Sequence, residues 1–521
     1  MESSQHSLQQ TLKKPNTPAL KVKNRLIYYA IIVDRYIFAY LGSQCFYSLS
    51  IFMDTIANKN NFNFTKEENE YYIGVFTSVF YLGSALGSIL TGFLTRMDTR
   101  MVFALLRIGN GLGLVLFAYP DTRVMILARF MMGFFYDASC TINCWSMYEI
   151  LLPRHRQRAV TLVYFFNGIC FFSCTIAALF DDHGWLFWRL VFIVPGALLA
   201  AEVLLSLVAL PNINSLTYLV KVKSQGKAIK ALNYYLEEET ARYMVQKFQA
   251  NRITQKIDLG EALASETQTR DGLGSETQNE DGMILSQAQK NKKMNAELRK
   301  KNKQKSRKGV FWRDLRVYRV EITHVVIFTL TSMLSFHDLF YQFSVYLGAK
   351  NLSNQKAVEV TKQFLVYGSA GKIISCFVAG GLNLTRKRKL CLVLCHLVTL
   401  ILLGLITYGY YIEDLTINRY CLALGPVFTV GLYSVNDIYS NDICPPSLFS
   451  INHTLVRGVS AVFGMLIPYY IHFEIYTYRK IALRLLSLII IGAVCLLWLV
   501  VRMIETDGME KKAIRKKLKG R

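Results

Sequence analysis

The chain has 521 residues, of which 52% are apolar, and a formal net charge of +24. A chain of this length and apolar content is typical of an integral membrane protein rather than a soluble domain. The positive charge would also suit a nucleic-acid-binding protein. The lysines and arginines, however, lie in the N-terminal segment, short loops, one long insert and the C-terminal tail, where membrane topology accounts for them. We therefore expect a lipid bilayer as partner and no nucleic acid.

Twelve apolar stretches are long enough to span a bilayer, for which a helix needs about 20 residues. They lie near residues 26–53, 71–95, 101–119, 124–147, 159–180, 185–210, 320–347, 360–382, 390–412, 420–441, 448–473 and 480–504. The predicted fold is an all-α membrane protein whose twelve transmembrane helices form two six-helix bundles. The predicted division is an N-terminal segment (1–25), a first bundle (26–210), an insert (211–319), a second bundle (320–504) and a basic tail (505–521).

Loop charges predict the orientation. Basic residues precede the first span and follow the fourth, eighth and twelfth, whereas the loops between are acidic or mixed. The positive-inside rule then places both termini in the cytoplasm, in a multi-pass protein of the plasma membrane or of an internal membrane. Residues 1–25 lack an apolar core, so we expect no cleavable signal peptide. The eleven cysteines lie almost wholly in apolar stretches and are interpreted as packing residues, with metal ligation and disulfides as the alternative.

The insert has three parts. Ser215 to Phe248 has helical periodicity and predicts a pair of amphipathic helices. Two near-identical polar repeats, Ser265 to Gly272 and Ser275 to Gly282, predict disorder. The run from Lys290 to Lys308 carries ten basic residues and one acid, and together with the tail it predicts attraction to anionic lipids, at roughly 1 kcal/mol per nearby charge. A targeting or partner-binding role is the alternative for this run.

The stretch from Gly83 to Arg107 carries the most specific motif. Gly83 and Gly87 are four residues apart on an apolar helix, a spacing that lets helices approach closely in lipid. The turn that follows resembles the signature G-x-L-A-D-R-x-G-R-R between helices 2 and 3 of major facilitator superfamily transporters. The matching residues are Gly92, Leu94 and Arg100, whereas Arg96 replaces the acid and Thr99 the second glycine.

An internal repeat agrees with this resemblance. Thr95-Arg96 has a counterpart in Thr385-Arg386, and Glu149-x-x-x-Pro153 has one in Asp442-x-x-x-Pro446, at offsets of 290 and 293 residues. Two parallel six-helix halves are what the major facilitator fold requires. Further landmarks resemble the sugar-porter and organic-cation-transporter branch, namely Arg129-x-x-x-Gly133, Trp188-Arg189, Gly425-Pro426 and Gly464-x-x-x-Pro468.

The resemblance implies that spans 1, 4, 7 and 10 line a central cavity. Their polar residues are interpreted as a substrate pathway: Asp34, Arg129, Asp137, Asn143, Asp338, Gln342, Tyr433, Asn436 and Asp437. A charge at the centre of a membrane helix costs about 2.5–3.5 kcal/mol, so several aligned ones favour a water-filled path. The alternatives are interhelical hydrogen bonds or buried ion pairs, such as Arg129 with Asp137 or Asp34 with Arg35. Glu202 and His396 are expected to satisfy structural partners.

The resemblance also implies charged contacts that close a cytoplasmic gate. In the first half these are Arg96 or Arg100 with Glu149, near Arg156, and in the second half Arg386 or Arg388 with Asp442. No motif of an enzyme, cofactor site or metal site is recognisable.

The function we expect is secondary active or facilitative transport of a small polar or charged organic solute by alternating access. The acidic residues Asp137, Asp338 and Asp437 favour a cationic or proton-coupled solute, and the lack of paired glutamines in span 7 disfavours a hexose. The alternative is a non-transporting receptor or scaffold that retains the transporter fold.

The polar face of the tenth span yields a prediction. Asp437 shares one helical face with Tyr433, Asn436, Ser440 and Asn441. We expect Asp437→Asn to impair solute uptake, or to shift its dependence on pH, while surface expression stays intact. Uptake equal to wild type at every pH would contradict the assignment of Asp437 to the pathway.

Overall fold

The regular structure is helical throughout the described part of the computed structural model, apart from one isolated bridge between Val22 and Leu236. The structure describes residues 20–59, 66–94, 97–179, 185–209, 219, 225–249, 322–324, 366–378, 381, 388–412, 417–418, 420–421, 424–428, 439, 443, 458, 461–462, 464–465, 478–506, 514 and 517.

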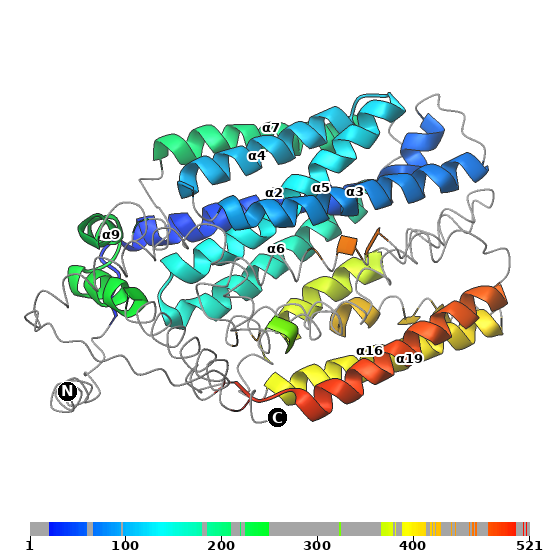
Figure 1. Ribbon diagram of the computed structural model, residues 1–521. Coiled ribbons are helices and arrows are strands. Elements are labelled where there is room, and N and C mark those ends of the chain that lie inside the picture. Colours follow the sequence, from blue (N-terminus) through cyan, green and yellow to red (C-terminus); the bar gives the residue numbers. More distant parts are fainter. Residues whose placement is uncertain are drawn as a thin grey trace, which may run out of the picture.

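Six long helices form the first half of the molecule and lie together in one bundle (Figure 1). They are α2 (Arg25–Lys59), α3 (Lys66–Leu94), α4 (Thr99–Phe117), α5 (Thr122–Ile150), α6 (Pro153–Leu179) and α7 (Trp185–Ala209). Each coincides with one of the first six predicted spans. Local chemistry sets several of their starts: Asp98 accepts a hydrogen bond from the Arg100 amide at 3.0 Å, and Asp121 caps α5 through the Arg123 and Val124 amides.

The second half is described in part. Helices α16 (Arg388–Tyr411) and α19 (Tyr478–Arg502) lie side by side and pack through Leu403, Ile406 and Leu485 (Figure 1). A shorter apolar helix, Val366–Val378, falls within the predicted eighth span. Most of the predicted spans 320–347, 420–441 and 448–473 lies outside the described residues. Among the described residues, seven helices are long and apolar enough to cross a membrane.

The outer surfaces of these helices are apolar, as lipid contact requires. On α4 the residues Met101, Leu105, Ile108 and Leu112 are exposed and recur at helical spacing. The opposite face of the same helix buries Phe103, Leu106 and Phe117 in the core of the bundle. Since apolar side chains on the outside gain nothing by meeting each other in lipid, helix contacts have to come from close packing and polar bonds.

Close packing joins α3 to α5. A Cβ atom on Gly83 or Gly87 of α3 would collide with the carbonyl oxygen of Phe130 or Phe134, and one on Gly133 of α5 would collide with that of Phe80. The glycines therefore allow backbone to meet backbone along several turns, as the spacing of Gly83 and Gly87 predicted.

Two further short helices pack against the ends of the first bundle. Helix α9 (Gln225–Leu232) and a helix over residues 238–249 bury Leu232 and Met244 against Ile150 and Leu152 at the end of α5. Burial raises the pKa of Tyr235, which keeps its hydroxyl protonated so that it donates to the Ile150 carbonyl at 3.3 Å. The periodicity of residues 215–248 had predicted this pair of helices.

Among the described residues, side chains of α3 and α6 are among those that meet the second half. Phe165 of α6 stacks edge-on against Phe377 of the Val366–Val378 helix, with ring centroids 5.5 Å apart. Tyr81 of α3 packs on Gly464, where a Cβ atom would lie 2.5 Å from the tyrosine ring. These contacts place α6 against the Val366–Val378 helix and α3 against Gly464.

The glycine contacts predict unequal effects of two equivalent substitutions. Gly133→Ala should lower the apparent melting temperature of the purified protein by several degrees, because overpacking against the Phe80 backbone costs about 1–3 kcal/mol. Gly404→Ala on α16 is the matched control, since nothing lies within 4 Å of its added Cβ and alanine favours a helix by about 1 kcal/mol over glycine. Equal thermal unfolding of the two variants would contradict the close approach of α3 and α5.

Candidate functional site: a buried charge cluster in the first bundle

Helices α4 and α7 cross closely at a pair of glycines. A Cβ atom on Gly111 would lie 2.8 Å from the Gly196 carbonyl oxygen, and the reverse distance is also 2.8 Å. Arg107 precedes Gly111 by one helical turn, and Glu202 follows Gly196 by six residues. The crossing therefore brings a long basic side chain of α4 within reach of an acidic one of α7, inside the membrane-spanning bundle.

Arg107 is the centre of the resulting cluster. Its guanidinium is 1% exposed and lies 2.8 Å from Asp34 Oδ1 of α2 and 3.2 Å from each carboxylate oxygen of Glu202. It also donates to Ser206 Oγ at 2.9 Å. One side chain thus binds three residues and ties together α2, α4 and α7.

Arg35 completes the charge balance. Its Nη1 atom lies 3.3 Å from Asp34 Oδ2, and its guanidinium carbon lies 3.4 Å from the centre of the Phe103 ring. The cluster therefore holds two guanidinium and two carboxylate groups, and it is neutral when all four are ionised. Such charges are tolerated in a low-dielectric interior only when they are paired in this way.

Polar residues of α5 lie along the same bundle. Arg129 donates to the Cys45 carbonyl of α2 and lies 4.2 Å from the centre of the Phe80 ring. Asp137 accepts from Ser84 Oγ of α3 at 2.9 Å. Asn143 Nδ2 donates to the Arg35 carbonyl at 3.0 Å. The structure therefore joins these three predicted pathway residues to α2 and α3 by interhelical bonds, the alternative considered for them above.

A buried lysine lies where the halves meet. Lys372 is 2% exposed, and its ammonium donates to Tyr47 Oη at 3.2 Å. It also lies 4.3 Å and 4.4 Å from the ring centres of Tyr47 of α2 and Phe171 of α6. These cation–π contacts link the Val366–Val378 helix to two helices of the first half.

The remaining predicted site residues are placed only in part. Arg156 Nε donates to the Leu151 carbonyl at 2.9 Å, and Arg100 and Glu149 are half-buried. Arg388 begins α16. The following predicted residues lie outside the described part of the chain: Arg96, Asp338, Gln342, Arg386, Tyr433, Asn436, Asp437 and Asp442.

Arg107 is the centre of the charge cluster, and sequence reasoning missed it. Asp34 was singled out for its depth, about 12 Å along the helix from Leu26, and Glu202 was expected to have a structural partner. The sequence signal for Arg107 was of the same kind as for Asp34 and Glu202, because Arg107 is the lone charge within the apolar stretch 101–119. An unpaired base in one span and an unpaired acid in another together predict an interhelical ion pair.

Removing Arg107 should be costly, and the cost should depend on Glu202. Arg107→Leu leaves an uncompensated buried carboxylate, an error worth about 3–5 kcal/mol, so we expect a large loss of folded protein in thermal unfolding. Adding Glu202→Gln should recover most of that loss, because Asp34 and Arg35 then remain as a neutral pair.

The matched control is Arg242→Leu, which removes an exposed partner of Glu238 and should cost about 0–1 kcal/mol. A double Arg107→Leu, Glu202→Gln variant no more stable than Arg107→Leu alone would show that charge balance does not hold this cluster together.

Solved structures share this fold. The proton:xylose symporter XylE bound to 6-bromo-6-deoxy-D-glucose aligns over 94% of this chain and 99% of its own, with a TM-score of 0.64 and 14% identity. XylE from E. coli in a partially occluded inward-open conformation aligns over 92% and 99%, with a TM-score of 0.55 and 14% identity. The human organic anion transporter MFSD10 aligns over 90% and 99%, with a TM-score of 0.52 and 11% identity. At these identities the likeness is one of fold. No curated protein sequence matches the chain.

The family model of the Major Facilitator Superfamily matches residues 36–440. This range covers most of the chain, from α2 through α16, and ends before α19. Members of the superfamily are transporters and not enzymes, and the apolar helices make this chain a multi-pass integral membrane protein. The chain belongs to the major facilitator superfamily.

Proposed function

We propose that the protein is a secondary transporter that moves a small polar or charged organic solute across a membrane by alternating access. In this proposal the chain forms twelve transmembrane helices in two six-helix halves, with both termini in the cytoplasm. The buried charge cluster of Asp34, Arg35, Arg107 and Glu202 is the observation that carries the proposal.

The charge cluster stabilises the helix bundle less efficiently than apolar packing would. Replacing a buried ionic network by apolar residues of similar size is often neutral or stabilising. Ionisable residues within membrane helices are therefore rare, and where they occur they mark ion pathways and proton relays. Two carboxylates arranged around one guanidinium are more than packing requires, which favours a functional role.

Proton coupling follows from the charge balance of the cluster. A proton on Glu202 leaves the four groups with one net positive charge and weakens the hold of Glu202 on Arg107. Arg107 is then free to bind Asp34 alone, so α7 and α2 no longer share one partner. Protonation thus favours one arrangement of the bundle over another, which is what a coupled transporter needs.

The contacts between the halves are the proposed moving part. Phe165 with Phe377, and Lys372 with Tyr47 and Phe171, are side-chain contacts that can separate and re-form. Within the first half, by contrast, backbone packs on backbone at glycines. We propose that the halves rock as rigid bodies, with Arg129, Asp137 and Asn143 of α5 beside the solute pathway.

The proposed substrate is a class of compounds, namely small polar or charged organic solutes. The similar structures include a proton:xylose symporter and an organic anion transporter. These two activities belong to those proteins and support transport of a small organic solute here, with protons as one coupling ion.

The cluster predicts that a substitution can abolish proton-driven uptake and leave solute exchange intact. Glu202→Gln imitates the protonated carboxyl, so we expect uptake driven by a proton gradient in proteoliposomes to fall to near background. Counterflow of the same labelled solute, which needs binding and exchange but no net proton movement, should persist. A panel of labelled sugars, amines and carboxylates identifies the solute on the wild-type protein first.

Glu238→Gln is the matched control, because Glu238 is exposed and forms an ion pair with the exposed Arg242. Gradient-driven uptake by Glu202→Gln equal to that of wild type would exclude the cluster from coupling. No flux of any solute by the wild-type protein, together with a stable cytoplasmic partner, would instead favour the receptor or scaffold alternative.

A further inference from the structure

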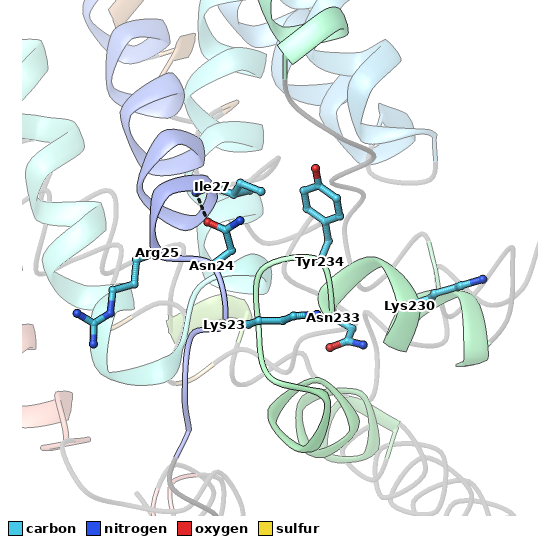
Figure 2. Close-up of a pocket in the computed structure, with 7 residues that line it drawn as sticks. All are labelled: Lys23, Asn24, Arg25, Ile27, Lys230, Asn233 and Tyr234. Carbon is cyan, nitrogen blue, oxygen red and sulfur yellow. Dashed lines mark hydrogen bonds between the residues drawn. The ribbon is translucent and has the colours of Figure 1, made fainter.

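A cavity lies at the junction between the N-terminal segment and the insert. Its volume is about 750 Å³, and Figure 2 shows the seven residues around it. Three basic and two amide side chains make up most of the lining, with one tyrosine and one isoleucine: Lys23, Arg25, Lys230, Asn24, Asn233, Tyr234 and Ile27. Lys23 extends toward Asn233, while Arg25 and Lys230 extend to either side (Figure 2).

The chemistry of the lining selects an anion. No acidic residue is among the seven lining residues, so the lining carries three cations and no carboxylate, and Lys23 extends toward Asn233 (Figure 2). Asn24 Oδ1 accepts from the Ile27 amide at 3.2 Å and caps the start of α2. The positive end of the α2 dipole therefore adds to the field of the side chains.

Backbone bonds hold the two walls of the cavity together. The Lys23 amide donates to the Tyr235 carbonyl at 2.9 Å, and the Lys21 amide donates to Thr240 Oγ1 at 3.0 Å. Val22 and Leu236 form the one isolated bridge in the described residues. The N-terminal segment and the turn after α9 are thus joined as one unit, and the distance between Lys23 and Asn233 does not depend on flexible side chains alone.

The position of the cavity selects a lipid. The apolar span of α2 begins at Arg25, so the cavity lies at the end of a membrane-spanning segment, where headgroups are found. Directly beyond it, Leu26, Tyr29, Val33 and Ile37 are 82%, 57%, 50% and 43% exposed. Their spacing places them on one face of α2. A molecule with a charged head in the cavity would find an apolar path for its tail along this face.

We propose that this cavity binds the phosphate-bearing headgroup of an anionic phospholipid, whose acyl chain lies along the Leu26–Ile37 face of α2. None of the seven lining residues belongs to the basic run Lys290–Lys308 or to the charge cluster within the bundle. It joins the N-terminal segment, the insert and α2, so an occupied site stabilises the contact among the three.

The test measures lipid binding to the full-length protein in detergent, by native mass spectrometry and by thermal unfolding. The probes are phosphatidylinositol phosphate, phosphatidylcholine, a soluble inositol phosphate and inorganic phosphate. We expect phosphatidylinositol phosphate to bind and to raise the melting temperature, and the other three to do so much less. Lys23→Gln with Lys230→Gln should weaken that binding by about thirtyfold, as the loss of two charges near a phosphate implies.

The matched control is Lys227→Gln with Lys247→Gln, an equal loss of charge at exposed positions that do not line the cavity. Equal lipid binding by both double variants would overturn the proposal and assign the lipid to other basic segments. A soluble inositol phosphate or inorganic phosphate that binds as tightly as the lipid would also overturn it, in favour of a free anion. Both readouts are independent of transport, so they do not depend on the proposed function.

Discussion

The fold depends on one constraint, that a charge placed in lipid has to meet an opposite charge from another helix. Arg107 satisfies it by binding Asp34 of α2 and Glu202 of α7 at once. This single side chain relates three helices of the first bundle in depth and rotation, since a shift of α7 by a turn would leave Glu202 without Arg107 and a shift of α2 would separate Asp34 from Arg107. Apolar contacts cannot impose such a register, because one apolar face meets lipid as readily as it meets another.

Close packing at glycines makes that pairing possible, and it also holds helices of the first half together. Gly111 and Gly196 let α4 and α7 cross closely enough for Arg107 to reach Glu202, and the glycines of α3 and α5 join those helices backbone to backbone. The described contacts between the halves use large side chains such as Phe377 and Lys372, and also Tyr81, which packs on Gly464. A first half that is closely packed and that meets the second half through side chains fits the proposed alternating access.

Helix α2 connects the three regions described above. Its first turn borders the cavity at the insert, and Tyr28 lies 2.8 Å from His155 Nδ1 and accepts from the Leu152 amide. Asp34 follows within the charge cluster, and Tyr47 meets Lys372 of the other half. One continuous helix therefore contributes residues to the N-terminal junction, to the charge cluster and to the contact between the halves.

The apolar stretches, their bounds in the first half, the close approach at Gly83 and Gly87 and the helices around residues 225–249 were predictable from sequence, because each depends on neighbours within a few turns. The depth of Asp34 in the membrane was predictable for the same reason. Its partner on another helix was not predictable, because the neighbouring Arg35 was a plausible partner and Arg107 lies 73 positions away. The way the helices cross decides which basic and acidic side chains meet. The crossing in turn depends on the positions where two backbones can pack closely. Only the tertiary structure decided that Arg107, Asp34 and Glu202 form one cluster.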